Sequence, residues 1–177
     1  MNQNLFFICG PTGIGKSSLA LRLAKKINGV IINSDSMQIY SNLEILTARP
    51  SKTDCQIVRH ELYGYVSGSE RYNVAKWCND ISRIITINKK NNTPSIIVGG
   101  TGMYINSLLN GLIDLPPILE SYKDESKCML ESIGLDNFVK LILDIDSEAL
   151  ANISQNDSFR LRRIWEIYKS TGVTFTE

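Results

Sequence analysis

A glycine-rich segment near the start of the sequence carries residue types that bind phosphate. It reads Gly10, Pro11, Thr12, Gly13, Ile14, Gly15, Lys16 and Ser17, which fits G-x-x-x-x-G-K-[ST] at every fixed position. In this pattern the glycines let successive backbone amides point at an anion, and the helix that follows adds the partial positive charge of its N-terminus. Lys16 supplies a full charge, and the Ser17 hydroxyl is the usual ligand of Mg²⁺. The segment therefore predicts a polyphosphate-binding loop with Mg²⁺ as cofactor.

An aspartate, Asp35, follows a second apolar segment, in the run NSDSMQIY at residues 33–40. The carboxyl ends of strands form the ligand crevice of a parallel α/β sheet, so we expect Asp35 to lie beside the phosphate-binding loop. A carboxylate at that place can bind Mg²⁺, act as a general base, or cap a helix. The residues alone leave these three roles open.

The run IIVGGTGMY, at residues 96–104, is the third candidate element. Nucleotide hydrolases with a phosphate-binding loop mostly carry an aspartate at the end of such a strand, where it holds Mg²⁺. Here Gly99, Gly100 and Thr101 occupy that position, and the run NKKN at 88–91 lacks the aspartate of an N-K-x-D motif. The sequence thus disfavours a hydrolytic switch or motor, although the two glycines by themselves also fit a simple turn.

Three arginines lie close together near the end of the sequence, in the run NDSFRLRRIWEIYKSTG at residues 156–172. Helical spacing places Arg160 and Arg163 on one flank of an apolar stripe that includes Leu161, and it places Arg162 on the opposite flank. Such a helix is either a solvated basic face or a surface that grips the phosphates of a ligand or of an RNA backbone.

Strand and helix patterns alternate along the first part of the chain. Apolar segments predict strands at 5–9, 30–32 and 95–98 and a weaker strand at 62–66, and helical spacing predicts helices at 19–27, 72–90 and 102–110. This alternation is typical of the α/β class. Together with the phosphate-binding loop it indicates a P-loop NTPase-like parallel sheet with helices on both faces.

The pattern changes at Leu115, Pro116 and Pro117. Beyond them no strand pattern remains, and the helical segments lie at 119–133, 135–143, 146–153 and from the Asn156–Asp157 cap to Gly172. We therefore predict a P-loop core domain at 1–115 and a helical insertion domain at 116–177.

The composition of the 177 residues is that of an ordinary globular protein, with 43% hydrophobic and 21% charged residues. A net charge of +1 does not by itself indicate a nucleic-acid partner. Four scattered cysteines and one histidine offer too few ligands for a zinc site in the usual spacings, and they fit free thiols in a reducing compartment. No signal peptide or membrane span is evident, so we expect a cytoplasmic protein, and we expect a monomer.

Taken together, these segments resemble the tRNA dimethylallyltransferases, which are also called tRNA isopentenyltransferases. The anchors are GPTGIGKS, NSDSMQIY, TARPS, GGTGMYI, GLIDLPP and NDSFRLRRIWEIYKSTG, in the order and approximate spacing of that family. The phosphate-binding loop alone is shared with many unrelated enzymes, whereas Asp35–Gln38 together with Gly99–Tyr104 is far more specific. The resemblance covers the chain from end to end.

The resemblance implies transfer of a dimethylallyl group from dimethylallyl diphosphate to the exocyclic amine of the adenosine 3′-adjacent to the anticodon, with release of diphosphate. It implies that residues 10–17 bind the diphosphate, that Lys16 stabilises this leaving group, and that Ser17 binds Mg²⁺. It further implies that Asp35 is the base that accepts the proton of the amine, and that Thr101 is a second catalytic residue.

The anticodon loop of tRNA is the partner that the resemblance implies. By family position the residues that contact tRNA are Asp35, Ser36, Met37, Gln38, Thr101, Lys123, Phe159, Arg160, Leu161, Arg162 and Arg163. The departures from the family pattern are Phe159 for glutamine, Lys123 for arginine, Leu46 for glycine, Arg49 for lysine, and Glu61 for the second of two histidines. At position 123 the bidentate phosphate contact of an arginine is lost.

Members of that family are usually longer than this chain, so we expect a C-terminally truncated member, either a fragment or a shortened gene product. Two other interpretations stay open. One is a small-molecule P-loop kinase that binds ATP, in which the arginines at 160–163 serve a lid; the runs at 99–102 and 35–38 disfavour it. The other is a non-catalytic remnant that binds RNA or diphosphate without turnover.

Overall fold

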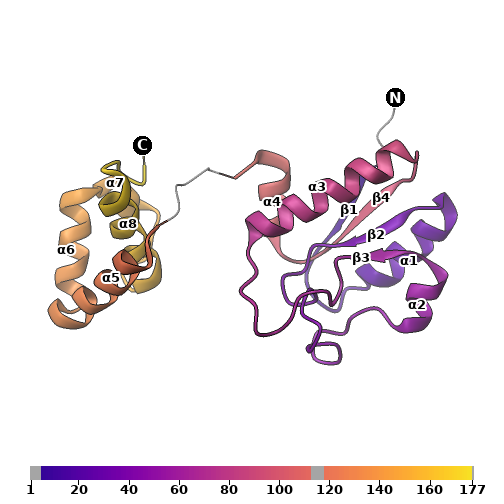
Figure 1. Ribbon diagram of the computed structural model, residues 1–177, viewed down its shortest axis with the longest axis horizontal. Coiled ribbons are helices and arrows are strands. Elements are labelled where there is room, and N and C mark those ends of the chain that lie inside the picture. The colour runs from indigo at the N-terminus through magenta and orange to yellow at the C-terminus, as the bar shows by residue number, and fades with distance from the viewer. Residues whose placement is uncertain (1–4, 113–117, 177) are drawn as a thin grey trace. The chain divides into compact units, whose positions relative to one another are not determined.

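The computed structural model describes residues 5–112 and 118–176. The chain forms two compact units, residues 1–113 and 114–177, which are described here one at a time (Figure 1). The predicted boundary between residues 115 and 116 lies outside the described residues.

Within its described part, the first unit is built on a parallel four-stranded sheet. The strands, in spatial order, are β1 (Leu5–Cys9), β4 (Ser95–Gly99), β2 (Val30–Asn33) and β3 (His60–Glu61). Cys9 pairs with Gly99, and Asn33 pairs with Val98, so the carboxyl ends of three neighbouring strands are level. The predicted α/β fold with a parallel sheet is confirmed.

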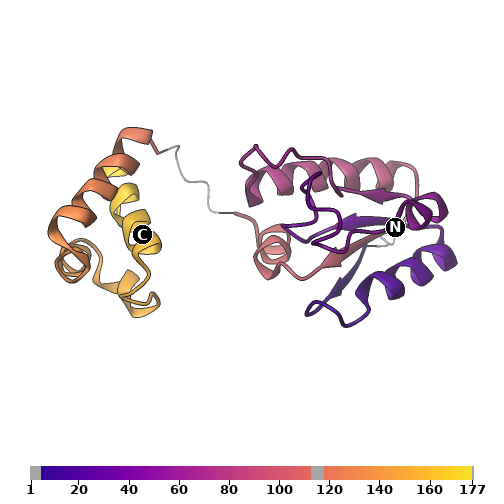
Figure 2. The same cartoon turned by 90° about the horizontal axis from the view of Figure 1, so that it is seen from below.

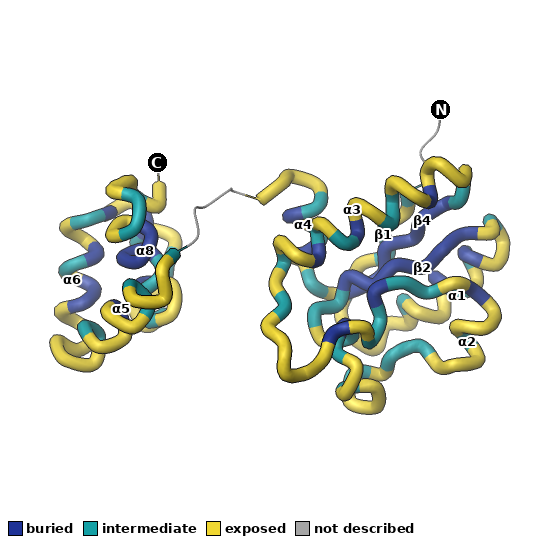
Figure 3. Tube along the Cα trace, viewed as in Figure 1, coloured by how far each residue is buried: buried dark blue, intermediate teal, exposed yellow. Residues whose placement is uncertain are grey.

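Helices cover both faces of this sheet, as Figure 2 shows. The helices of the first unit are α1 (Lys16–Ile27), α2 (Lys52–Ile57), α3 (Val74–Lys90) and α4 (Gly102–Asn110). Side chains alternate along β2, so that Ile31 packs in the cluster of α1, whereas Val30 and Ile32 pack in the cluster of α3. Figure 3 shows the resulting core of buried residues running along β2 and β4.

Two elements differ from the sequence prediction. The weak strand expected at 62–66 was wrong: the strand is His60–Glu61, and Leu62 adopts a left-handed conformation (φ 63°) that turns the chain away. The short helix α2 was not expected, although Ser51 and Asp54 form a capping box at its start.

The second unit contains, among its described residues, the helices α5 (Glu120–Ile133), α6 (Leu135–Ile145), α7 (Ser147–Ala151) and α8 (Ser158–Thr171). Its core consists of Phe138, Val139, Ile142, Ala149, Leu161, Ile164 and Trp165. In the described part of the whole chain, no helix is long and apolar enough to span a membrane.

Asp146 fixes the junction of α6 and α7, and only 5% of its surface is exposed. Its carboxylate accepts hydrogen bonds from the Ala149 N–H (3.0 Å), the Thr176 N–H (3.0 Å) and the Thr176 hydroxyl (2.9 Å). Burial acts to raise the pKa of this carboxyl, but the hydrogen bonds outweigh burial and hold the pKa below its ordinary value of 3.8. The charged form of Asp146 therefore stabilises the second unit.

We expect Asp146→Asn to lower the unfolding free energy of the second unit by about 1–3 kcal/mol at neutral pH, because charge-assisted hydrogen bonds are lost. A carboxyl with a lowered pKa contributes stability above its unfolded-state pKa and loses it as the pH falls through its folded-state pKa. The difference from wild type should therefore shrink below about pH 4. Urea unfolding followed by Trp165 fluorescence, in a Trp77→Phe background, measures this difference in unfolding free energy at each pH. A difference that stays constant down to about pH 2 would contradict this account.

Candidate functional site

The predicted phosphate-binding loop connects β1 to α1. Gly13 (φ 85°) and Gly15 (φ 90°) lie in the left-handed region that favours glycine, and Gly15 directly precedes the first turn of α1. The Lys16 ammonium donates a hydrogen bond to the Pro11 carbonyl (2.7 Å), which folds the lysine back over the loop. The loop therefore has the backbone form and the positive charge that an anion requires.

Ser17 is exposed at the first turn of α1, where its hydroxyl fits a role as an Mg²⁺ ligand. Among the described residues, no group of three or more His, Cys, Asp or Glu side chains is arranged to hold a metal ion. Mg²⁺ binds well through few protein ligands when phosphate oxygens and water complete its coordination. The residues present thus fit a metal that arrives with a phosphorylated ligand.

Asp35 is held in place by the fully buried Asn33. The Asn33 side chain accepts a hydrogen bond from the Asp35 N–H (2.8 Å) and donates to the carbonyls of Asp35 (2.9 Å) and Leu62 (3.0 Å). The Trp77 indole N–H donates to the Asn33 carbonyl (2.9 Å). One carboxylate oxygen of Asp35 accepts the Met37 N–H (2.9 Å), so the carboxylate has a defined orientation.

Thr101 connects the end of β4 to the segment that carries Asp35. Its hydroxyl oxygen accepts a hydrogen bond from the Ser36 N–H (3.0 Å), and the hydroxyl donates to the Ser36 hydroxyl (3.4 Å). A Cβ added to Gly99 would lie 2.4 Å from the Ser34 side-chain oxygen, so only glycine allows this approach of β4 and β2. A Cβ on Gly100 would be 3.2 Å from the Gly10 carbonyl, which places the phosphate-binding loop against the same segment.

Met37 and Gln38, which were predicted to contact tRNA, differ in their surroundings. Met37 is 49% exposed. Gln38 is half-buried, and its amide donates to the Thr47 carbonyl (2.8 Å), which braces the loop that follows. Gln38 therefore has a structural contact besides any role in binding.

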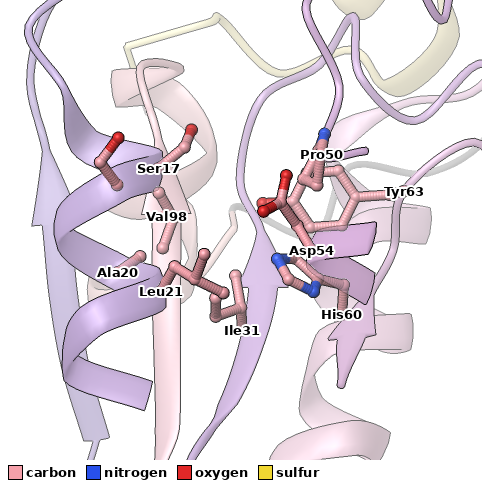
Figure 4. Close-up of a pocket in the computed structure, with 10 residues that line it drawn as sticks. Ser17, Ala20, Leu21, Ile31, Pro50, Asp54, His60, Tyr63 and Val98 are labelled. Carbon is pink, nitrogen blue, oxygen red and sulfur yellow. The ribbon is translucent and has the colours of Figure 1, made fainter. Parts of the chain in front are cut away.

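A pocket opens beside the phosphate-binding loop on the α1 face of the sheet (Figure 4). In Figure 4, Ser17 and Leu21 on α1 lie across the opening from Asp54, His60 and Tyr63. Burial and, to a lesser degree, the nearby Asp35 carboxylate raise the pKa of the Tyr63 hydroxyl above its ordinary value. The pocket therefore adjoins both the loop and the surroundings of Asp35.

The second unit carries the other residues that were predicted to contact tRNA. Phe159 is 78% exposed in the first turn of α8, whereas Leu161 is buried in the core and its side chain serves packing. Arg162 donates to the Ser126 hydroxyl (3.0 Å) and the Lys123 carbonyl (3.1 Å), which ties α8 to α5. Lys123 itself pairs with Glu120, an exposed ion pair with a separation of 2.6 Å.

Ion pairs engage all three arginines of α8. Arg160 pairs with Asp157 (3.0 Å), and its side chain remains 66% exposed. Arg162 and Arg163 both lie near the carboxylate of the buried Glu166, at 3.7 Å and 3.6 Å. The three arginines therefore share two acidic partners, the N-cap residue Asp157 and the buried Glu166.

Sequence reasoning missed Asn33, Glu166 and Tyr63. Asn33 and Glu166 act through contacts with residues 29 and 40 positions away, which local patterns do not reveal. A polar residue inside an otherwise apolar strand was the one available signal for Asn33.

Comparisons with known proteins agree with this geometry. The family model described as IPP transferase matches residues 38–177, and the one described as isopentenyl transferase matches residues 3–67. The tRNA dimethylallyltransferase of Bartonella quintana is 42% identical over 96% of this chain and 57% of that protein. The tRNA dimethylallyltransferase of Pelagibacter ubique is 40% identical over 97% of this chain and 55% of that protein. The chain thus spans about half the length of the curated relatives it matches.

Solved structures show the same likeness. A eukaryotic dimethylallyltransferase acting on tRNA matches with a TM-score of 0.81 at 30% identity, over 98% of this chain and 43% of that chain. The full-length tRNA isopentenylpyrophosphate transferase from Bacillus halodurans matches with a TM-score of 0.62 at 33% identity, over 97% of this chain and 57% of that chain.

We expect Asn33→Ala to lower the unfolding free energy of the first unit by at least about 2 kcal/mol, because the backbone groups of Asp35 and Leu62 lose their hydrogen bonds to the Asn33 side chain. Urea unfolding followed by Trp77 fluorescence, in a Trp165→Phe background, measures this effect. Asn110→Ala, at an exposed position of α4, is the matched control and should change stability by less than about 0.5 kcal/mol. Equal effects of the two substitutions would contradict the role given to Asn33.

Proposed function

Because this chain belongs to the IPP transferase family, we propose that it contributes the donor-binding core and part of the RNA-binding region of a tRNA dimethylallyltransferase. The family membership confirms the resemblance seen in the motifs. The proposed reaction transfers a dimethylallyl group from its diphosphate to the exocyclic amine of the adenosine 3′-adjacent to the anticodon, and it releases diphosphate.

The phosphate-binding loop has the features needed to hold and stabilise the departing diphosphate. Negative charge grows on this group as the bond to the allylic carbon breaks, and preorganised donors are most effective where charge develops. We assign the backbone amides of residues 10–17 and the Lys16 ammonium to this task. Mg²⁺, held by Ser17 and phosphate oxygens, would supply further charge stabilisation when bound.

Asp35 is proposed as the base. The exocyclic amine of adenosine is a weak nucleophile, so removal of its proton as it attacks the allylic carbon lowers the barrier. The Asp35 carboxylate is oriented by the Met37 N–H, and the neighbouring Ser36 is fixed to Thr101. In this proposal Thr101 holds the base segment through Ser36, and we assign its hydroxyl a contact with the same substrate.

One observation supports the proposal most directly: the hydrogen bond from the Ser36 N–H to the Thr101 hydroxyl oxygen, at 3.0 Å. It joins the ends of β2 and β4, and Gly100 on the same segment approaches Gly10 of the phosphate-binding loop. The Asp35 carboxylate and the proposed diphosphate site thus lie at the adjoining ends of β2, β4 and β1. This arrangement suits a reaction in which diphosphate leaves while a carboxylate removes the proton of the attacking amine. The missing acid after β4 fits a transferase better than a nucleotide hydrolase.

The RNA partner is proposed to be the anticodon loop of tRNA. Unpaired loop bases can be extruded and stacked on aromatic side chains, and an enzyme that modifies a base must remove it from the stack. The exposed Phe159 and Arg160 have the chemistry for stacking and for a phosphate contact. We further propose that the protein acts in the cytoplasm, since donor and tRNA are both soluble, and that it does so as a monomer.

The test is transfer of label from dimethylallyl diphosphate to a tRNA that carries adenosine at the modified position, in the presence of Mg²⁺. We expect Asp35→Asn to slow transfer by at least about 100-fold, because the proton acceptor is lost. Binding of dimethylallyl diphosphate should stay within about twofold of wild type, since Asp35 is not assigned to the diphosphate. Asp136→Asn, at an exposed position of α6, is the control and should transfer at the wild-type rate.

If no transfer is seen, protection of the chain against thermal unfolding by dimethylallyl diphosphate or by ATP separates the remaining explanations. A ligand at about 100 times its dissociation constant adds about 2.7 kcal/mol to the unfolding free energy. Protection by dimethylallyl diphosphate without transfer would show that these residues form the donor site but need further sequence for turnover. Protection by ATP alone would refute the proposal in favour of a P-loop kinase.

A further inference from the structure

One buried carboxylate of the second unit has no role in the reaction proposed above. Glu166 lies on α8, and only 6% of its surface is exposed. A buried charge is costly unless it is paired and hydrogen-bonded, so a carboxylate at this place needs partners. Glu166 has such partners on two elements, α5 and its own helix α8.

The two carboxylate oxygens of Glu166 face different partners. Oε1 accepts a hydrogen bond from the Ser126 hydroxyl of α5 (2.8 Å), and the Arg162 guanidinium lies 3.7 Å away. Arg162 Nε also donates to the Ser126 hydroxyl (3.0 Å). Oε2 lies 3.6 Å from Nη1 of Arg163. One oxygen is thus fixed to the contact between α5 and α8, and the other is directed at a side chain that is 39% exposed.

Arg163 belongs to an exposed stripe of α8. Residues three and four positions apart are neighbours on a helix, so Arg163 shares one side of α8 with the exposed Phe159 and Arg160. The stripe offers an aromatic ring and two guanidinium groups. An aromatic ring can stack on an unpaired base, and guanidinium groups bind phosphates, so this side of α8 has the chemistry that an RNA loop requires.

The ion pair between Arg163 and Glu166 leaves the arginine able to bind a phosphate. At 3.6 Å it is longer than a hydrogen bond, so it fixes the position of the guanidinium without occupying its fork of N–H donors. A long arginine side chain loses rotamer freedom when it binds, and an arginine that is already held in place loses less. A buried anchor therefore favours a phosphate contact by Arg163.

We propose, on the basis of the proposed function, that Glu166 is a positioning residue that holds Arg163 for contact with a phosphate of the tRNA. Charge alone predicts the opposite effect of this carboxylate, because a negative charge near a phosphate repels it. Removing the charge of Glu166 would then strengthen tRNA binding, whereas loss of positioning weakens it. The direction of the change in tRNA affinity distinguishes the two.

The test is binding of a tRNA with adenosine 3′-adjacent to its anticodon, followed by fluorescence anisotropy between about 50 and 200 mM KCl. Glu166→Gln should weaken binding by at least about fivefold, because a charge-assisted contact with phosphate is lost. The slope of log affinity against log salt should become shallower by about 0.7–0.9, the value for one phosphate contact. Arg163→Ala should have both effects, and the double substitution should weaken binding no further, because the two residues act through one contact.

Asp146→Asn is the matched control. It makes the same carboxylate-to-amide change at another buried position of the second unit, where the carboxylate bonds Ala149 and Thr176. It should leave tRNA affinity within about twofold and the salt slope unchanged, although it lowers the stability of the unit. If Glu166 served stability alone, the two substitutions would affect tRNA binding alike. Circular dichroism of each variant establishes that it is folded.

The outcomes separate this inference from the function on which it rests. If Glu166→Gln binds tRNA as tightly as wild type, or more tightly, Glu166 does not position Arg163, and the proposed function stands. A tRNA affinity of Arg163→Ala equal to that of wild type overturns the inference whether or not Glu166→Gln folds. If a folded wild-type chain binds no tRNA even at the lower salt concentration, the proposed RNA partner fails and the inference fails with it.

Discussion

The buried side chain of Asn33 is the interaction on which the site depends. It bonds both the N–H and the carbonyl of Asp35, and it reaches across to the carbonyl of Leu62. Its own carbonyl accepts the indole N–H of Trp77 from α3. The side-chain amide thus fixes the exits of β2 and β3, and the backbone carbonyl of the same residue fixes the position of a helix. A buried network of this kind is rigid only when every member is satisfied.

A second close contact lies on the other side of β2, where this strand meets β4. Ser34 lies against Gly99 so closely that no side chain fits at position 99, and Thr101 then reaches Ser36. Because β4 lies between β1 and β2, any displacement of this segment also moves it relative to Gly10. Gly99, at the end of β4, and Gly100 therefore serve close packing of three strand ends, which a simple turn would not require.

Local patterns in the sequence were enough to predict the parallel sheet and, apart from α2, the helices of both units. They failed at β3, because the chain leaves this strand through the left-handed Leu62, whose carbonyl is held by Asn33 from 29 residues away. The placement of Asp35 near the loop followed from strand topology alone. The pocket lined by Leu21 and Tyr63 could not be predicted, because α1 and the segment after β3 meet only in the folded sheet.

The three arginines of α8 look equivalent in the sequence but have different roles in the structure. Arg162 is 24% exposed and holds α5 through two hydrogen bonds, so removing it would leave the buried Glu166 without one of its partners. Losing a partner of a buried charge is costly. Arg160 is paired only with Asp157 on the surface, and such pairs contribute little to stability. If tRNA is the partner, as we propose, Arg160 is therefore the arginine of α8 that can exchange its ion pair for a contact with an RNA phosphate at the smallest cost in stability.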